Sequence, residues 1–151
     1  MTSLFHVGVA VSNLAESIQA FEKCFGFETI SRRTVDNDYI GILVGAPNIT
    51  ADIAMLDIGD GKFLELISWG KGSSAPTQMN IPSLNHVGTH HICVYVDDVD
   101  EAFKKLTGFP EVRLVSERPI TVPVGPNAGC KVFFALILGE IYIEVFERVL
   151  L

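Results

Sequence analysis

Residues 6–11 alternate between valines and smaller or polar residues, which is typical of a β-strand. The valines share one face, which is suited to packing against a helix, whereas the histidine, glycine and alanine between them would line an open concavity. Apolar residues then recur at helical spacing over residues 14–25. Asn13 is suited to cap this helix and Gly26 to end it, so the pattern predicts a strand followed by an amphipathic helix.

Short apolar segments separated by turn residues predict further strands in the first half of the chain. Asp60 and Gly61 make a turn that would join the last two as a hairpin. Glycine, serine and proline then gather after Trp69, which indicates a linker. The expected strands span residues 28–34, 39–44, 51–58 and 62–68.

The second half repeats this order. Residues 91–96 alternate again, and Asp97 or Asp98 would cap a helix over residues 99–106 that Gly108 ends. A strand is expected near residues 113–117, followed by a proline-containing loop. The segments 130–138 and 140–146 then predict a closing hairpin that turns at Gly139 and Glu140.

Each half is interpreted as a βαβββ module, and self-similarity of this kind is a strong guide to architecture. The predicted fold class is α+β, with two tandem modules forming a curved mixed sheet around a metal cleft. We expect residues 1–70 to form the first module, residues 71–88 the linker and residues 89–151 the second module, all within one compact domain.

Two histidines and two glutamates occupy matching positions in the repeat. His6 and His91 begin the first strands and lie 85 residues apart, while Glu65 and Glu144 lie in the last strands, 79 residues apart. A carboxylate in the middle of an apolar strand is costly unless it is paired, hydrogen-bonded or bound to a metal. One such residue alone is more often a cap or a surface group. The matched set of four instead predicts a shared divalent ion, with Ni²⁺, Co²⁺, Mn²⁺, Zn²⁺ or Fe²⁺ as candidates.

His90 is the rival ligand to its neighbour His91, but the repeat aligns His90 with Phe5 and places it on the other strand face. His86 falls in the linker and is interpreted as a polar loop residue. Four basic side chains are available to hold a carboxylate or phosphate, although each fits a solvated surface charge better: Arg32, Arg33, Arg118 and Lys131.

The composition narrows the class of partner and the compartment. A net charge of −7 argues against nucleic acid or an anionic membrane as a partner. Three cysteines without CxxC spacing suggest reduced, mostly buried thiols in a cytoplasmic protein. We expect no signal peptide, and the longest apolar stretch, residues 132–138, is too short to cross a bilayer.

Four segments resemble the vicinal oxygen chelate superfamily, which includes glyoxalase I, methylmalonyl-CoA epimerase, extradiol dioxygenases and the bleomycin-resistance proteins. The segments are the valine-rich opening strand, FEKCFGF at 21–27, THHICVYVDD at 89–98, and the closing strands FLELI and YIEVF. The resemblance implies paired βαβββ modules around a metal that His6, Glu65, His91 and Glu144 bind. It also implies a homodimer and a small-molecule substrate with vicinal oxygens.

The resemblance favours an enzyme, a metal-dependent lyase or isomerase of the glyoxalase I or acyl-CoA epimerase type. Such an enzyme moves a proton alpha to a carbonyl through a metal-bound enediolate or enolate. Glu144 is expected to be the catalytic base, with Glu65 on the other face of the substrate. Two alternatives stay open: a non-haem Fe(II) ring-cleaving dioxygenase that uses His6, His91 and Glu144, and a metal-free antibiotic-binding resistance protein.

Overall fold

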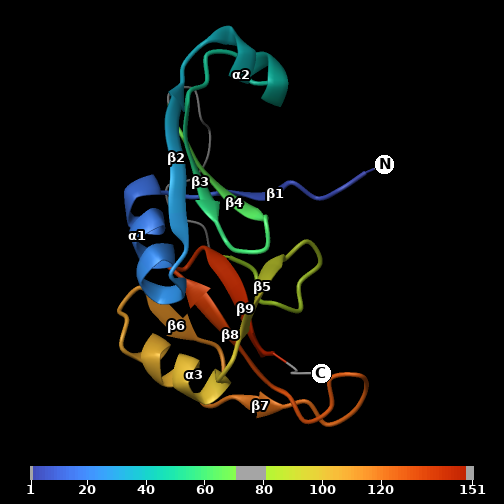
Figure 1. The fold of residues 1–151 in the computed structure, drawn as a ribbon. Coiled ribbons are helices and arrows are strands. Elements are labelled where there is room, and N and C mark those ends of the chain that lie inside the picture. Colours follow the sequence, from blue (N-terminus) through green and yellow to red (C-terminus); the bar gives the residue numbers. More distant parts are fainter. Residues whose placement is uncertain (1, 71–80, 149–151) are drawn as a thin grey trace. The chain divides into compact units, whose positions relative to one another are not determined.

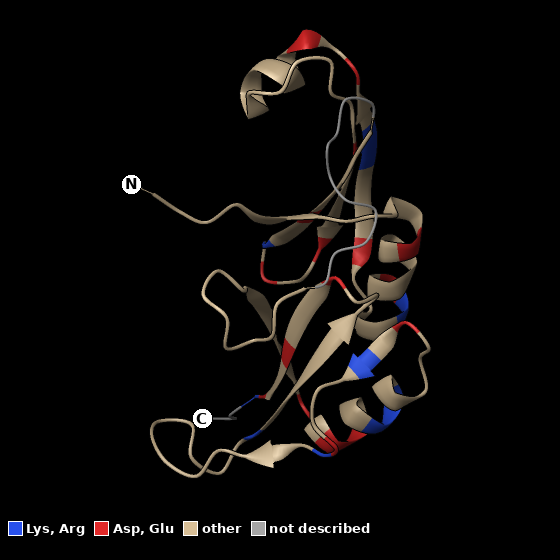
Figure 2. Cartoon of the chain, turned by 180° about the vertical axis from the view of Figure 1, so that it is seen from behind, with Lys and Arg blue, Asp and Glu red and all other residues tan. Residues whose placement is uncertain are grey.

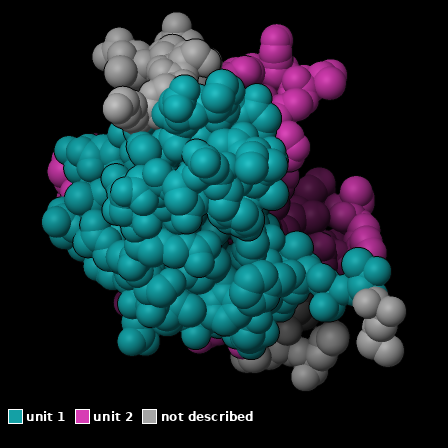
Figure 3. Space-filling view, turned by 90° about the horizontal axis from the view of Figure 1, so that it is seen from above, with its two compact units in different colours: residues 1–78 teal, residues 79–151 magenta. Residues whose placement is uncertain are grey.

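The structure, a computed structural model, describes residues 2–70 and 81–148. The chain divides into two compact units, residues 1–78 and 79–151, which Figure 3 colours separately. Most of the expected linker, residues 71–80, lies outside the described residues, so the predicted module boundaries stay predictions. No described helix has the length and apolar character needed to cross a bilayer.

The first unit is a four-stranded mixed sheet with one helix on its surface and a second at its end (Figure 1). The strands lie in the order β1-β4-β3-β2, with β1 parallel to β4 and the other pairs antiparallel. In chain order the elements are β1 (His6–Ala10), α1 (Leu14–Phe25), β2 (Glu28–Val35), α2 (Asp38–Val44), β3 (Ala51–Asp57) and β4 (Phe63–Trp69).

Helix α1 begins and ends where the sequence predicts. The Asn13 side chain accepts hydrogen bonds from the backbone amides of Ala15 and Glu16, and Gly26 ends the helix in the left-handed conformation at φ 71°. The apolar face of α1 packs against β3 and β4. It meets a layer of fully buried strand residues, Ala54, Leu56, Leu64 and Leu66. This layer is the core of the unit, and the opposite face of the sheet is left for the site.

The strand expected at residues 39–44 is wrong, because this segment forms α2. It contains a short apolar run, for which periodicity alone cannot distinguish a strand from a helix. Ile40 is buried against Ala51 and Ile53 of β3, whereas Ile42 is 81% exposed. Gly41 is required there, because a Cβ on it would lie 2.9 Å from the carbonyl oxygen of Ala46. One side of the run therefore packs on the sheet, and no neighbouring strand pairs with it.

The second unit repeats the architecture, with strands in the order β5-β9-β8-β6 and the short β7 paired to β8. The strand expected at 113–117 ends earlier, at Leu114, although Val115 still donates a backbone hydrogen bond to Phe134. The elements are β5 (His91–Val96), α3 (Val99–Thr107), β6 (Val112–Leu114), β7 (Ile120–Thr121), β8 (Lys131–Ile137) and β9 (Ile141–Glu147). The α+β repeat of βαβββ modules is confirmed, with α2 and β7 as additions.

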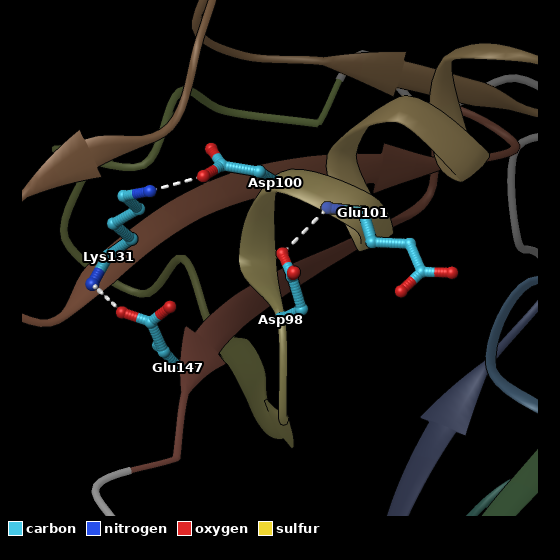
Figure 4. A network of polar contacts seen from close by, with 5 residues as sticks. All are labelled: Asp98, Asp100, Glu101, Lys131 and Glu147. Atoms are coloured by element: carbon cyan, nitrogen blue, oxygen red, sulfur yellow. Dashed lines mark hydrogen bonds and ion pairs between the residues drawn. The ribbon is translucent and has the colours of Figure 1, made fainter.

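Helix α3 packs against β6, β8 and β9, and polar contacts surround its first turn (Figure 4). Asp98 caps the helix by accepting a hydrogen bond from the Glu101 amide at 2.9 Å. The Lys131 ammonium pairs with Asp100, which raises the Lys131 pKa, and the Lys131 amide donates to Glu147. The helix also carries acidic residues in its first turn and lysines in its last, which suits its dipole (Figure 2). Lys131 is therefore committed to a structural contact.

Candidate functional site

His6 and Glu65 meet on the sheet face that α1 leaves uncovered. They lie on the parallel neighbours β1 and β4, and His6 Nε2 is 3.4 Å from Glu65 Oε2. Gly8 is the direct partner of Glu65 in the strand register, and a Cβ on it would lie 3.4 Å from the same oxygen. The missing side chain leaves room for the carboxylate, which is 13% exposed. The first unit thus places an imidazole against a largely buried carboxylate.

His91 and Glu144 form the equivalent pair in the second unit. Strands β5 and β9 are parallel neighbours, and His91 Nε2 is 3.2 Å from Glu144 Oε2. The strand register is the same in both units, because each histidine pairs with the residue two positions before its glutamate. His91, and not His90, is the histidine that faces the carboxylate. The Glu144 side chain is 22% exposed.

Aromatic edges support both imidazoles. The ring of Phe5 lies 5.1 Å from that of His6 and 5.6 Å from that of Phe63, both in edge-on geometry. In the second unit, Phe134 lies edge-on to His91 at 5.2 Å. Edge-on ring contacts of this kind are favourable and restrict ring orientation. Each histidine is therefore held with Nε2 toward its glutamate.

Cys93 takes the position in the second unit that Gly8 has in the first. It is the direct cross-strand partner of Glu144. Partial burial of the thiol, then the charge of Glu144 and a hydrogen bond to it, raise the Cys93 pKa from 9.0 to about 11. Of the three free cysteines, only Cys24 is fully buried, and Cys93 is exposed. The expectation that all are mostly buried is therefore wrong for Cys93, which lies on the exposed strand face of His91.

Arg33 is a further charged residue near the first pair. Its Nη2 atom lies 3.9 Å from Glu65 Oε1, and its side chain is 64% exposed. The sequence marks Arg33 as basic but cannot connect it with Glu65, because the connection depends on the pairing of β2, β3 and β4. Similarly, the contact of Cys93 with Glu144 follows from strand register, which aligning the two repeats would indicate.

The chemistry of each pair suits two ligands of one divalent ion. At metal–ligand distances of about 2.1 Å, the two N···O separations correspond to ligand–metal–ligand angles of roughly 100° to 110°. His6 Nδ1 is buried without a hydrogen-bond partner in the described chain, so Nε2 is the nitrogen presented to the carboxylate. The described residues contain no cluster of three or more candidate ligands. Each unit therefore supplies half of the predicted set, and a common four-residue site stays a prediction.

The fold and these pairs define the class of protein. The chain belongs to the glyoxalase/bleomycin resistance protein/dioxygenase superfamily, whose sequence profile matches residues 5–134, and this confirms the predicted superfamily. Over 138 residues it is 32% identical to a 2-epi-5-epi-valiolone epimerase from Actinomyces sp., covering 88% of this chain and 73% of that protein. This relative supports an enzyme within the superfamily.

Two solved structures share the fold. A glyoxalase family protein from Bacillus cereus is similar with a TM-score of 0.84 at 21% identity, covering 99% of this chain and 95% of that one. The fosfomycin resistance protein FosX from Listeria monocytogenes, solved with Mn(II) and sulfate, is similar with a TM-score of 0.61 at 14% identity. That match covers 99% of this chain and 95% of FosX. At these identities the likeness establishes the fold alone.

Proposed function

We propose that the protein is a divalent-metal-dependent epimerase or isomerase that moves a proton next to a carbonyl in a small molecule with vicinal oxygens. The observation that carries the proposal is the repeated His–Glu pair, found at the same strand register in both units. The similarity to an epimerase at 32% identity supports the same reaction class. His6, Glu65, His91 and Glu144 would together bind one ion.

A bound divalent ion would act as a Lewis acid for the negative charge that develops on the substrate oxygens when the proton leaves. The histidines would hold their neutral Nε2 atoms toward the ion, supported by the Phe5 and Phe134 edges. Mixed imidazole and carboxylate sets suit Ni²⁺, Co²⁺, Mn²⁺, Zn²⁺ and Fe²⁺. The remaining coordination positions would accept two neighbouring oxygens of the substrate.

Glu144 is proposed as the base that takes the proton, with Glu65 on the opposite face of the reacting carbon. Inversion of a stereocentre beside a carbonyl requires a proton to leave from one face and return to the other. Glu144 is the more exposed of the two carboxylates, at 22% against 13%. That difference favours Glu144 as the carboxylate that reaches substrate.

The name of the relative supports a polyhydroxylated cyclic ketone as the substrate. A ketone with a neighbouring hydroxyl provides two adjacent oxygens for chelation and an acidified C–H bond between them. A hemithioacetal of a 2-oxoaldehyde also has a hydroxyl beside a carbonyl, and a 2-methyl acyl-CoA thioester has an acidified C–H bond beside its carbonyl, so these are the comparison substrates.

The test uses metal-free protein reloaded separately with each candidate ion and incubated with 2-epi-5-epi-valiolone in D₂O. NMR would follow deuterium incorporation next to the carbonyl and the appearance of a second epimer. We expect both to require metal and to stop with EDTA. Exchange that is unaffected by metal removal would contradict the proposal. Oxygen-dependent ring cleavage by the iron form would favour a dioxygenase, and chelator-insensitive antibiotic binding without exchange would favour a resistance protein.

A further inference from the structure

We propose that Arg33 is a positioning residue that orients the Glu65 carboxylate as a metal ligand, and that this makes the two halves of the site inequivalent. The inference rests on the proposed function, because it concerns the same four-ligand site. It adds a residue that lies outside the ligand set and acts through Glu65.

The register of three strands places Arg33 on the site face. Arg33 of β2 pairs with Ile53 of β3, which pairs with Ile67 of β4. Ile67 lies two residues after Glu65, so the row that holds Arg33 faces the same side as Glu65. The neighbour Arg32 pairs with Ala54 and faces the opposite side. The sheet therefore directs one of the two adjacent arginines to the carboxylate.

The two oxygens of Glu65 have different partners. Oε2 lies 3.4 Å from His6 Nε2, and Oε1 lies 3.9 Å from Arg33 Nη2. The guanidinium charge lies on the Oε1 side, so Oε2 is the oxygen that would face an ion shared with His6. Arginine suits this role because its charge is permanent and its planar donors match a carboxylate. The ion pair therefore favours Glu65 as a single-oxygen ligand through Oε2.

The value of such a contact lies in its effect on the metal, since an exposed ion pair by itself contributes little to folding. Outer partners that orient a ligand characteristically change metal affinity by about 10- to 100-fold. Arg33 is 64% exposed and Glu65 only 13%, so the arginine contacts the carboxylate from its solvent side. Removal of Arg33 should leave the fold intact and weaken metal binding.

The described strands of the second unit carry no equivalent cation at this position. The row that corresponds to Arg33, Ile53 and Ile67 consists there of Ile120, Val132 and Phe146. Ile120 cannot pair with a carboxylate, and the direct cross-strand partner of Glu144 is the uncharged Cys93. Glu65 consequently has a cationic arginine beside it, whereas the ion-pair partner of Glu144 among the described residues is His91. The difference between Arg33 and Ile120 at equivalent strand positions thus places the two carboxylates in different surroundings.

The experiment titrates metal-free protein with Mn²⁺ and measures the free ion by its EPR signal, in the wild type, Arg33→Gln, Arg33→Lys and Arg32→Gln. Arg32→Gln is the matched control, because it removes the same charge from the opposite sheet face. We expect Arg33→Gln to raise the Mn²⁺ dissociation constant by about 10- to 100-fold and Arg33→Lys to restore part of the loss. Arg32→Gln should bind like the wild type, and the metal-free melting temperatures should agree.

Equal weakening by Arg32→Gln and Arg33→Gln would overturn the inference, because it would reveal an effect of net charge only. Unchanged Mn²⁺ affinity in Arg33→Gln would also overturn it. If that variant instead raised only KM for an anionic substrate, Arg33 would be a substrate anchor. A wild-type protein that keeps its fold and binds none of Ni²⁺, Co²⁺, Mn²⁺, Zn²⁺ and Fe²⁺ would overturn the proposed function itself, which is a separate result from a failure of Arg33.

Discussion

The Cys93 thiol offers a sensitive test of the second half-site. Cys93 is an exposed residue, but its thiol is partly buried beside Glu144. This burial, the charge of Glu144 and a hydrogen bond to it raise the Cys93 pKa from 9.0 to about 11. Only the thiolate is alkylated efficiently, so reactivity reports directly on the neighbouring charge. The perturbation is the replacement Glu144→Gln, which removes the negative charge and leaves a side chain of similar size.

The size of the effect follows from the pKa. At pH 8, a thiol of pKa 9.0 is ionised to roughly 10% and one of pKa 11 to roughly 0.1%, a difference of about 100-fold. A more basic thiolate is also more nucleophilic, with a Brønsted coefficient of about 0.4–0.5. This greater nucleophilicity raises the alkylation rate of each thiolate nearly tenfold and offsets part of the 100-fold difference. We therefore expect Cys93 to react about 10-fold more slowly than an unperturbed exposed cysteine at this pH.

The assay is pulse alkylation of metal-free protein with iodoacetamide between pH 7 and pH 10, read for each cysteine by peptide mass spectrometry. The Cys93 rate should rise throughout this range, without a plateau near 9. In Glu144→Gln the alkylation rate of Cys93 at pH 8 should increase. It should stay below the rate of an unperturbed exposed cysteine, because burial, the largest cause of the pKa shift, remains. Glu117→Gln, an exposed residue outside β9, controls for the loss of one charge.

A Cys93 rate that levels off at pH 9 or below in the wild type would refute the reasoning. The same pKa has a consequence for stability. Because the native thiol holds its proton more tightly than the unfolded one, its contribution is complete below pH 9 and is lost as the pH rises toward 11. The free energy of unfolding should therefore fall across that interval, and less steeply in Cys93→Ala.

Three further outcomes are expected. Glu144→Gln should retain much of the metal, measured by plasma mass spectrometry, while losing solvent deuterium exchange into substrate; exchange at the normal rate would show that another group is the base. Asn13→Ala and Asp98→Ala, which remove the two helix caps, should each lower the free energy of unfolding in urea by about 1 kcal/mol, and no change would contradict the capping role. Phe133→Ala, at a position only 2% exposed, should cost about 3–5 kcal/mol, whereas Ile42→Ala, at a position 81% exposed, should change stability by less than about 0.5 kcal/mol.

Local signals were sufficient where the chain caps and turns. The first helix could be bounded correctly because Asn13 and Gly26 act on backbone groups within a few residues of themselves. The hairpin at Asp60 and Gly61 was predictable for the same reason, since both residues take positive φ there. The helix caps and the turn depend on interactions between residues that are close in the sequence.

Segment 38–44 could not be assigned from its own residues, because its helix depends on contacts elsewhere. Ile40 is buried only because Ala51 and Ile53 present an apolar surface for it on β3. Nothing in the run itself reveals that surface, and a strand would have had a similar pattern. Tertiary packing decided the outcome.

The sequence repeat predicts the His–Glu pairs of the site but not their neighbour Arg33. Self-similarity identified His6 with Glu65 and His91 with Glu144, because a duplicated unit repeats its strand register. Arg33 could be recognised as a neighbour of Glu65 only across three paired strands, so its sequence position was uninformative. The predicted common site itself awaits the metal titration.

Divergence between the two copies gives the two matched glutamates different surroundings. In a two-base epimerisation one group takes a proton and another returns one on the opposite face of the same carbon, and exact duplication would give the two glutamates identical surroundings. The two units differ beside those glutamates, with Gly8 and Arg33 around Glu65, and Cys93 and Ile120 in the corresponding places around Glu144. These neighbours change the charge around each carboxylate while the His–Glu register stays the same. Differences at a few positions beside a repeated geometry are therefore sufficient to give two equivalent glutamates different charge environments.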